Sequence, residues 1–331
     1  MKQIFVQAQP DHIESLFKAA PISALEELIW NALDAKATEV MVDVVTNELH
    51  GINAIRVTDN GTGIDVLKAD QTFGNLGGSW KRGQAELHGR HGRGRFKAFA
   101  LGAFVEWRTT MRAGGELLSY VLSGEAAKPG VFELNAATPG PGTGTEVYIT
   151  GISANADSLF NSTETIEGLA SKFALYLKSY PNVRIWFNGL PVTPLIVQRS
   201  ANTYELAPEC KLEVIEWKRK FVGAGRLVWT GRDGFQLFEQ AANVRSGGVP
   251  FTAYLISDRF KALAAENALI MDELNPEVDK YLTLARTQLK EHFAATMEEH
   301  QNERVNEWIS EFNALPKKLR EAILTRLTSK E

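Results

Sequence analysis

The stretch ELIWNALDA, residues 27–35, is the feature that most constrains how this chain can fold. It has the spacing of an amphipathic helix, and at about 3.6 residues per turn Glu27, Asn31 and Asp34 fall on one stripe. The apolar residues of the helix gather on the other side and would bury it against a core: Leu25, Leu28, Ala32 and Leu33. Such a polar stripe indicates either a solvated face or one wall of a polar site. The helix alone does not decide between the two.

Length and composition indicate two globular domains in a reducing compartment. The 331 residues fit two domains of ordinary size, and the 44% of hydrophobic residues supply enough material for their cores. A net charge of -4 argues against a generic binder of polyanions. Cys210 is the only cysteine, which excludes an intrachain disulfide and argues against a cysteine-based zinc site. The sequence lacks a signal-peptide pattern and any apolar run of membrane-spanning length, so we expect a soluble cytoplasmic protein.

The pattern of predicted elements changes near Pro194. Before it, alternating and β-branched runs predict strands, at residues 38–45, 53–59, 116–123, 130–137, 142–150 and 182–189. A helix is expected from about Thr165 to Lys178. After Pro194, three further strand-like segments follow, at residues 211–220, 224–231 and 251–257.

A long charged helix is expected after Asn275. Its apolar residues recur at a spacing of three or four: Val278, Leu282, Ala285, Leu289, Phe293 and Met297. We expect this stripe to pack on the second domain, and the alternative is a helix that binds a partner.

A second polar feature is the segment VTDNGTGI, in which a predicted strand ends at Asp59. Gly61 and Gly63 permit backbone conformations and close approaches that other residues would block, so the segment is at least a tight turn. A buried carboxylate at a strand end can also accept a hydrogen bond from an exocyclic amino group. Such a bond selects adenine, because guanine has a carbonyl at that position.

A third feature is the basic, glycine-rich segment GRHGRGRFKAFALG at residues 89–102. Glycine-rich backbone that runs into a helix start presents free N–H groups to a phosphate, and the helix dipole adds to the attraction. The chain contains no Walker-type loop, and no strand directly precedes these glycines as a dinucleotide-binding fingerprint requires. A basic loop that binds nucleic acid is the remaining alternative.

The fourth feature, GPGTGTEVYIT at residues 140–150, places Thr145 where a strand leaves a glycine turn. Together and in this order, the four features resemble the GHKL ATPase superfamily, named for gyrase, heat-shock chaperone, histidine kinase and MutL. The resemblance covers about residues 20–188 and is strongest to the MutL, MORC and HSP90-like chaperone branch. The residues that carry it are Glu27, Asn31, Asp34 and Ala35 in the helix, Asp59, Gly61 and Gly63 in the turn, Gly89, Gly92 and Gly94 in the glycine-rich segment, and Gly144 and Thr145 in the last box.

The resemblance implies an α+β fold, the GHKL or Bergerat α/β sandwich, in which helices cover one face of a mixed sheet. It assigns residues 1–195 to an ATP-binding domain with a lid at about residues 65–95. Residues 196–331 would then form a smaller α/β domain that resembles a transducer, with the long C-terminal helix.

The resemblance also implies roles for the polar residues. Glu27 would be the catalytic base that activates the attacking water, and the side-chain carbonyl of Asn31 would bind Mg2+. Glu26 is a neighbouring carboxylate, but it points about 100° away on the helix, so the base is assigned to Glu27. The nucleotide would be bound by Asn31 together with Asp34, Asp59, Gly61, Gly63, Ile64, Gly89, Gly92, Arg93, Gly94, Lys97 and Thr145.

A chain with these motifs is expected to bind ATP and Mg2+ and to hydrolyse ATP slowly to ADP and phosphate. In the resembling proteins the nucleotide closes a lid and changes conformation or dimerisation. We therefore expect a nucleotide-dependent homodimer that serves a nucleic-acid, chaperone-like or defence process, with nucleic acid or a protein as partner and no membrane. Two alternatives are a regulatory subunit that binds ATP without hydrolysing it and a protein histidine kinase. The kinase is disfavoured because such proteins carry a phospho-acceptor helix, usually with a histidine beside an acidic residue, before the ATPase region. Here Asp11-His12 is the candidate pair, and it lies in a segment too short to form a dimerising hairpin.

Overall fold

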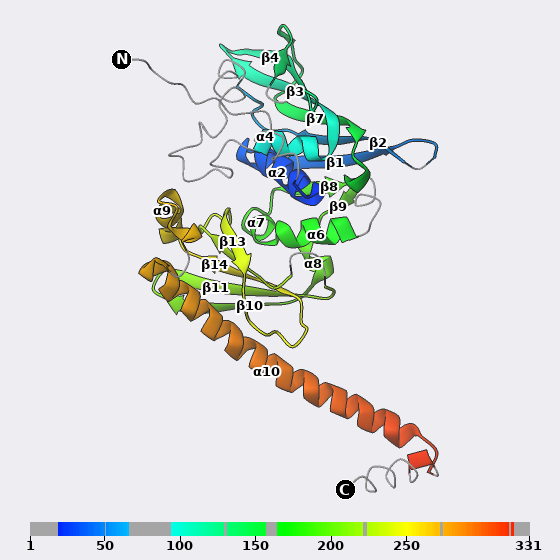
Figure 1. Cartoon of the computed structure of the whole chain (residues 1–331), viewed down its shortest axis with the longest axis vertical. Coiled ribbons are helices and arrows are strands. Elements are labelled where there is room, and N and C mark those ends of the chain that lie inside the picture. The colour runs from blue at the N-terminus through cyan, green and yellow to red at the C-terminus, as the bar shows by residue number, and fades with distance from the viewer. Residues whose placement is uncertain are drawn as a thin grey trace.

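The computed structural model describes residues 19–49, 51–65, 94–128, 131–156, 164–220, 224–271, 274–317 and 319–320. Within these residues the chain forms two β-sheets with helices packed against them (Figure 1). The expected boundary at residue 195 falls inside the short helix α8, Pro194–Val197, which lies between the two sheets in the chain. The division into two domains stays a prediction.

The first sheet is mixed and has nine strands in the described part of the chain, in the order β5-β4-β3-β7-β2-β1-β8-β9, with β6 paired to β4. Strands β1 and β8 run parallel, whereas β1, β2, β7 and β3 pair antiparallel with one another in that order. The strands are β1 Glu39–Thr46, β2 Ile52–Asp59, β3 Gly102–Ala113, β4 Glu116–Glu125, β5 Phe132–Leu134, β6 Thr138–Pro139, β7 Gly144–Ile152, β8 Arg184–Phe187 and β9 Leu190–Pro191. This mixed sheet confirms the expected α/β class.

Helices cover one face of the first sheet. They are α2 Pro21–Asp34, α4 Gly94–Lys97, the 3-10 helix η3 Ala98–Ala100, α6 Glu164–Lys172 and α7 Ala174–Ser179. Pro21 occupies the first turn of α2, where its missing N–H removes no hydrogen bond within the helix. The apolar side of α2 is buried as expected, with Leu25, Leu28, Ala32 and Leu33 at most 4% exposed.

The opposite face of the sheet is polar and more open. There the guanidinium groups of Arg56 and Arg108 lie over the ring of Tyr148, at 5.7 and 4.7 Å from its centroid. Glu146 forms ion pairs with both arginines, at 3.1 and 2.8 Å. In the described residues, the helices and the core therefore lie on one side of this sheet.

Two elements of this part differ from the sequence prediction. The helix expected from Thr165 to Lys178 is divided at Phe173, a fully buried residue whose ring packs against Trp30 of α2. Strand β3, the longest of the first sheet, was not predicted, although its alternate residues Val105, Trp107 and Thr109 point into the core.

The second sheet has five strands in the described residues, in the order β10-β11-β14-β12-β13, with β12 and β14 parallel. Its strands are β10 Gln198–Ala207, β11 Cys210–Trp217, β12 Arg226–Thr230, β13 Gln236–Ala241 and β14 Phe251–Ile256. The helices that follow are α9 Arg259–Ala265, the 3-10 helix η4 Ala268–Ile270 and α10 Pro276–Ala314.

Helix α10 begins with a side-chain cap and packs on the second sheet through its first half. The Asn275 side chain accepts hydrogen bonds from the N–H groups of Glu277 and Val278, at 3.0 and 3.2 Å. The stripe of Val278, Leu282, Ala285, Leu289 and Phe293 is fully buried, which confirms the expected packing for these residues. The side chain of Met297, the last member of the expected stripe, lies outside the described ones. The helix then extends away from the sheet (Figure 1). Among the described helices, α10 included, none combines the length and the apolar composition needed to span a membrane.

Candidate functional site

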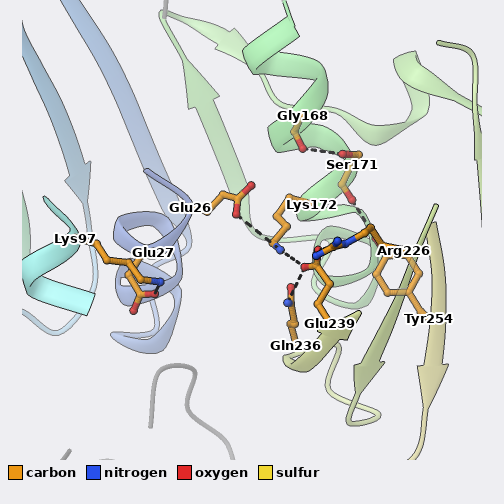
Figure 2. Close-up of polar contacts among 10 residues, drawn as sticks. All are labelled: Glu26, Glu27, Lys97, Gly168, Ser171, Lys172, Arg226, Gln236, Glu239 and Tyr254. Carbon is orange, nitrogen blue, oxygen red and sulfur yellow. Dashed lines mark hydrogen bonds and ion pairs between the residues drawn. The ribbon is translucent and has the colours of Figure 1, made fainter. Parts of the chain in front are cut away.

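Helix α2 places Glu27 inside the protein, against α4. The Glu27 side chain is 10% exposed, and its Oε2 lies 3.0 Å from Nζ of Lys97, the last residue of α4 (Figure 2). A buried carboxylate is destabilising unless an opposite charge or hydrogen bonds compensate it. Lys97 supplies both. Lys97, which the sequence assigns to nucleotide binding, thus forms an ion pair with Glu27, which it assigns as the catalytic base.

Asn31 and Asp34 follow Glu27 on α2, and both are partly exposed. The charge of Asp34 reaches Tyr176 of α7. Burial is the main cause that raises the pKa of Tyr176, and nearby negative charge, including that of Asp34, raises it further. The charge of Asp34 thus favours the neutral form of the Tyr176 phenol.

Asp59 ends β2 in register with Thr145 of β7, and Thr145 is in register with Thr109 of β3. The Gly61 N–H donates a hydrogen bond to Asp59 Oδ1 at 2.7 Å. Burial raises the pKa of Asp59 to about 6, although hydrogen bonds from the backbone N–H groups of Gly61 and Thr145 act in the opposite direction. The three strands thus bring a shielded carboxyl and two hydroxyls to one end of the sheet.

The hydroxyl of Thr145 is engaged within the protein. It lies 3.1 Å from the Thr109 hydroxyl, which also contacts the Gly144 carbonyl oxygen at 3.2 Å and accepts the Ile64 N–H at 2.8 Å. Thr145, which the sequence assigns to the nucleotide, is thus positioned by Thr109. Thr109 was missed because β3 was missed.

The glycines of the Asp59 segment allow it to pack between α2 and β3. The Thr62 N–H donates to the carbonyl oxygen of Ala35, just after α2, at 2.8 Å. A Cβ on Gly61 would lie 2.6 Å from that oxygen, and a Cβ on Gly63 would lie 2.2 Å from the Thr110 carbonyl oxygen. Gly63 also has a φ of +76°, which favours glycine. Both glycines are therefore required by the close approach of neighbouring backbone.

Asn60 is a second residue that the sequence prediction missed. Its Oδ1 accepts the N–H groups of Thr38 and Glu39, at 2.9 and 3.0 Å, and its Nδ2 donates to the Thr38 hydroxyl. It thereby fixes the start of β1 beside the end of β2. The asparagine in a strand–turn position was the available signal.

Part of the predicted site lies outside the described residues. This applies to Gly89, Gly92 and Arg93 and to most of the lid expected at residues 65–95. Gly94 begins α4. In the part of the chain that is described, no three His, Cys, Asp or Glu side chains gather into a group that could hold a metal ion.

The helix, the strand-end carboxyl and the glycine turn define the class of this part of the chain. Residues 19–128 match the family model for histidine kinase-, DNA gyrase B- and HSP90-like ATPases. This segment contains α2, the Asp59 turn and α4, and it belongs to the GHKL ATPase superfamily. The membership supports ATP binding.

Similar curated proteins carry the name DNA mismatch repair protein MutL. The protein of Staphylococcus carnosus is 53% identical over 45 residues, which are 14% of this chain and 6% of that protein. The protein of Aquifex aeolicus is 41% identical over 66 residues, 18% of this chain and 15% of that protein. The protein of Shouchella clausii is 38% identical over 53 residues, 16% of this chain and 8% of that protein. The similarity therefore spans a small part of each relative.

Proposed function

We propose that this chain is a magnesium-dependent ATPase that converts ATP and water slowly to ADP and phosphate. The observation that carries the proposal is the buried Glu27, which Lys97 Nζ holds at 3.0 Å on the side of α2 that also bears Asn31. The rigid helix sets the position of this carboxylate before the substrate arrives, and the movement of Lys97 toward the phosphates would free it to act as a general base.

Asp59 would bind the adenine amino group. A carboxylate can accept about four hydrogen bonds, so those from Gly61 and Thr145 do not exhaust its capacity. Its partial burial would make a missing donor unfavourable, which gives a preference for adenine over guanine.

Asn31 would contribute its side-chain carbonyl oxygen to Mg2+, the type of ligand that this ion prefers. The ion, when bound with ATP, neutralises charge on the phosphates. Glu27 would then take the proton of the attacking water. Gly89, Gly92, Arg93 and Gly94 would contact the phosphates, and Lys97 would turn from Glu27 toward them.

We further propose that ATP binding closes the segment at residues 65–95 and changes domain contacts or dimerisation. The name of the MutL relatives makes a nucleic-acid process one candidate, and a chaperone-like or defence process is another. A regulatory subunit that binds ATP without hydrolysis is the alternative, because GHKL members with an intact fold need not all hydrolyse ATP.

Phosphate release tests the proposal directly. The full chain should release phosphate from ATP with Mg2+ and not with EDTA, and Glu27→Gln should lower the rate on the order of 100-fold or more while ATP binding persists. Adding DNA or RNA shows whether nucleic acid stimulates the reaction. Hydrolysis at the parent rate by Glu27→Gln would falsify the assignment of the base, and ATP binding without any hydrolysis would favour the regulatory alternative.

A further inference from the structure

Helix α2 carries two neighbouring carboxylates with different partners. Glu27 contacts Lys97 of α4, whereas Glu26 contacts Lys172 at the end of α6 (Figure 2). Successive residues of an α-helix point about 100° apart, so one rigid helix presents the two side chains to different surroundings. Because α2 is rigid, the contacts that position Glu26 also help to position Glu27.

Lys172 connects α2 to the second sheet. Its Nζ lies 3.7 Å from Glu26 Oε2 and 2.5 Å from Oε2 of Glu239 on β13. Glu239 also forms an ion pair through Oε1 with Nε of Arg226 on β12, at 2.7 Å. Its Oε2 accepts a hydrogen bond from the side-chain amide of Gln236 at 2.9 Å. The side chains of Glu26, Lys172 and Glu239 are 19, 22 and 18% exposed, so water screens their charges only in part.

The same β12–β13 hairpin touches α2 at a second point. Phe235, just before β13, packs on Trp30 with ring centroids 5.7 Å apart. Trp30 lies one helical turn after Glu26, so both contacts are made on the same side of α2. An apolar contact and an ion-pair bridge thus hold this helix against one hairpin of the second sheet.

The two carboxylates do not share Lys172 equally. Burial disfavours the charge of Glu239, but Lys172 and Arg226 outweigh it and lower the pKa of Glu239. Burial raises the pKa of Glu26, which Lys172 only partly offsets. The ammonium therefore belongs mainly to Glu239, and Glu26 is its weaker partner.

The charge of Lys97 also reaches Glu26 and favours its ionised form. If Lys97 turns from Glu27 toward a phosphate, Glu26 loses part of this support and holds Lys172 less well. Linkage then requires the reverse effect, in which the state of the bridge alters the nucleotide site.

We propose that Lys172 is a positioning residue through which the β12–β13 hairpin controls the placement of α2 and hence ATP hydrolysis. This inference rests on the proposed function of Glu27, and it adds a route from the second sheet to that residue. Lys172 itself does not contact the reacting atoms. Removing it leaves α2 without its charged link to the hairpin.

The chain offers a matched control. Lys178 of α7 pairs with Glu213 of β11 at 2.8 Å, so it also joins the two parts of the chain, but through neither α2 nor the hairpin. Lys172→Met should lower kcat about tenfold with KM for ATP changed less than about twofold, a coupling of ordinary size. Lys172→Arg should recover most of the loss, and Lys178→Met should leave kcat within about twofold of the parent.

Glu239→Gln supplies a second variant if Lys172→Met does not fold. It removes the partner on the hairpin and leaves α2 itself unaltered, so a decrease in kcat like that of Lys172→Met supports the bridge. An effect of Glu26→Gln without one of Glu239→Gln would instead show a role local to α2 and overturn the inference. Equal decreases for the Lys172 and Lys178 variants would overturn it as well.

Amide hydrogen exchange of residues 21–34 gives a readout that does not depend on hydrolysis. Exchange should be faster in Lys172→Met and Glu239→Gln than in the parent, and unchanged in Lys178→Met. If the parent does not hydrolyse ATP, the proposed function fails, and this comparison alone decides whether the bridge holds α2. Unchanged exchange in both bridge variants removes the inference.

Discussion

Lys97 Nζ and Glu27 Oε2 lie 3.0 Å apart, although the two residues are separated by 70 positions in the sequence. The pair joins the helix that starts the GHKL segment to the short helix that follows its glycine-rich part. In this arrangement the cation occupies one oxygen of the proposed base. ATP would therefore compete with Glu27 for Lys97, and the arrival of the phosphates would free the base.

Lys97→Met should weaken ATP binding about tenfold or more, since a hydrogen bond to a charged group contributes about 1.5–3 kcal/mol. Isothermal titration with ATP and Mg2+ measures the change. Lys128→Met is the control, because Lys128 pairs only with the exposed Glu125 on the surface, at 3.3 Å, as far as the described contacts go. An unaltered ATP affinity in Lys97→Met would remove Lys97 from the nucleotide site.

Asp59→Asn should abolish measurable ATP binding, because the amide presents a donor as well as an acceptor to the adenine amino group. The parent should bind ATP more tightly than GTP in the same titration. Asn60→Asp tests whether any change in this turn has the same result, and its loss of affinity should be smaller. Equal affinities of the parent for ATP and GTP would contradict the contact between Asp59 and adenine.

The parts of the structure that could be predicted from sequence are those whose pattern is local. The stripe of α2 and that of α10 follow from helical spacing, and the strand before Asp59 follows from alternation. The helix break at Phe173 could not be predicted, because it depends on a ring that packs against Trp30, far away in the chain. β3 was overlooked although the signal was present, since Glu106 and Arg108 alternate with its inward residues as in a strand with one buried face.

Contacts between residues far apart in the sequence also limit the prediction of the site. Sequence spacing grouped Glu27 with Asn31, but no spacing relates Glu27 to Lys97 or Glu26 to Lys172. Such pairs depend on how the helices pack in the folded chain, which sequence spacing does not specify. Thr109 belongs to the same category, since its position beside Thr145 comes from the register of β3 with β7.

The raised pKa of Asp59 predicts how stability depends on pH. In the folded chain this pKa is about 6, compared with 3.8 for an unperturbed carboxyl. Between these values the folded state binds more protons at Asp59 than the unfolded state, so its contribution to the free energy of unfolding increases as the pH falls and is least favourable above pH 6.

Asp59→Asn removes this titration. In urea unfolding without nucleotide, the variant should be more stable than the parent at pH 8, and the difference should shrink toward pH 5. Circular dichroism at the two pH values measures it. A difference that is constant with pH would show that the folded environment does not disfavour the charge of Asp59.

The packing of the glycine turn gives the last prediction. Gly63→Ala places a methyl group 2.2 Å from the Thr110 carbonyl oxygen at a φ of +76°, so the variant combines backbone strain with a clash against β3. Gly114→Ala is the matched control, because Gly114 has a φ of +58° and its added Cβ meets nothing within 4 Å. The control should lose only the strain, about 1 kcal/mol, whereas Gly63→Ala should lose about 3 kcal/mol or more. Urea unfolding of the two variants measures the difference. Because Gly63 holds the segment that follows Asp59 against β3, its variant should also lose ATP affinity, and Gly114→Ala should not. Equal losses of stability in the two variants would mean that strain alone, and not the approach of Thr110, requires a glycine at position 63.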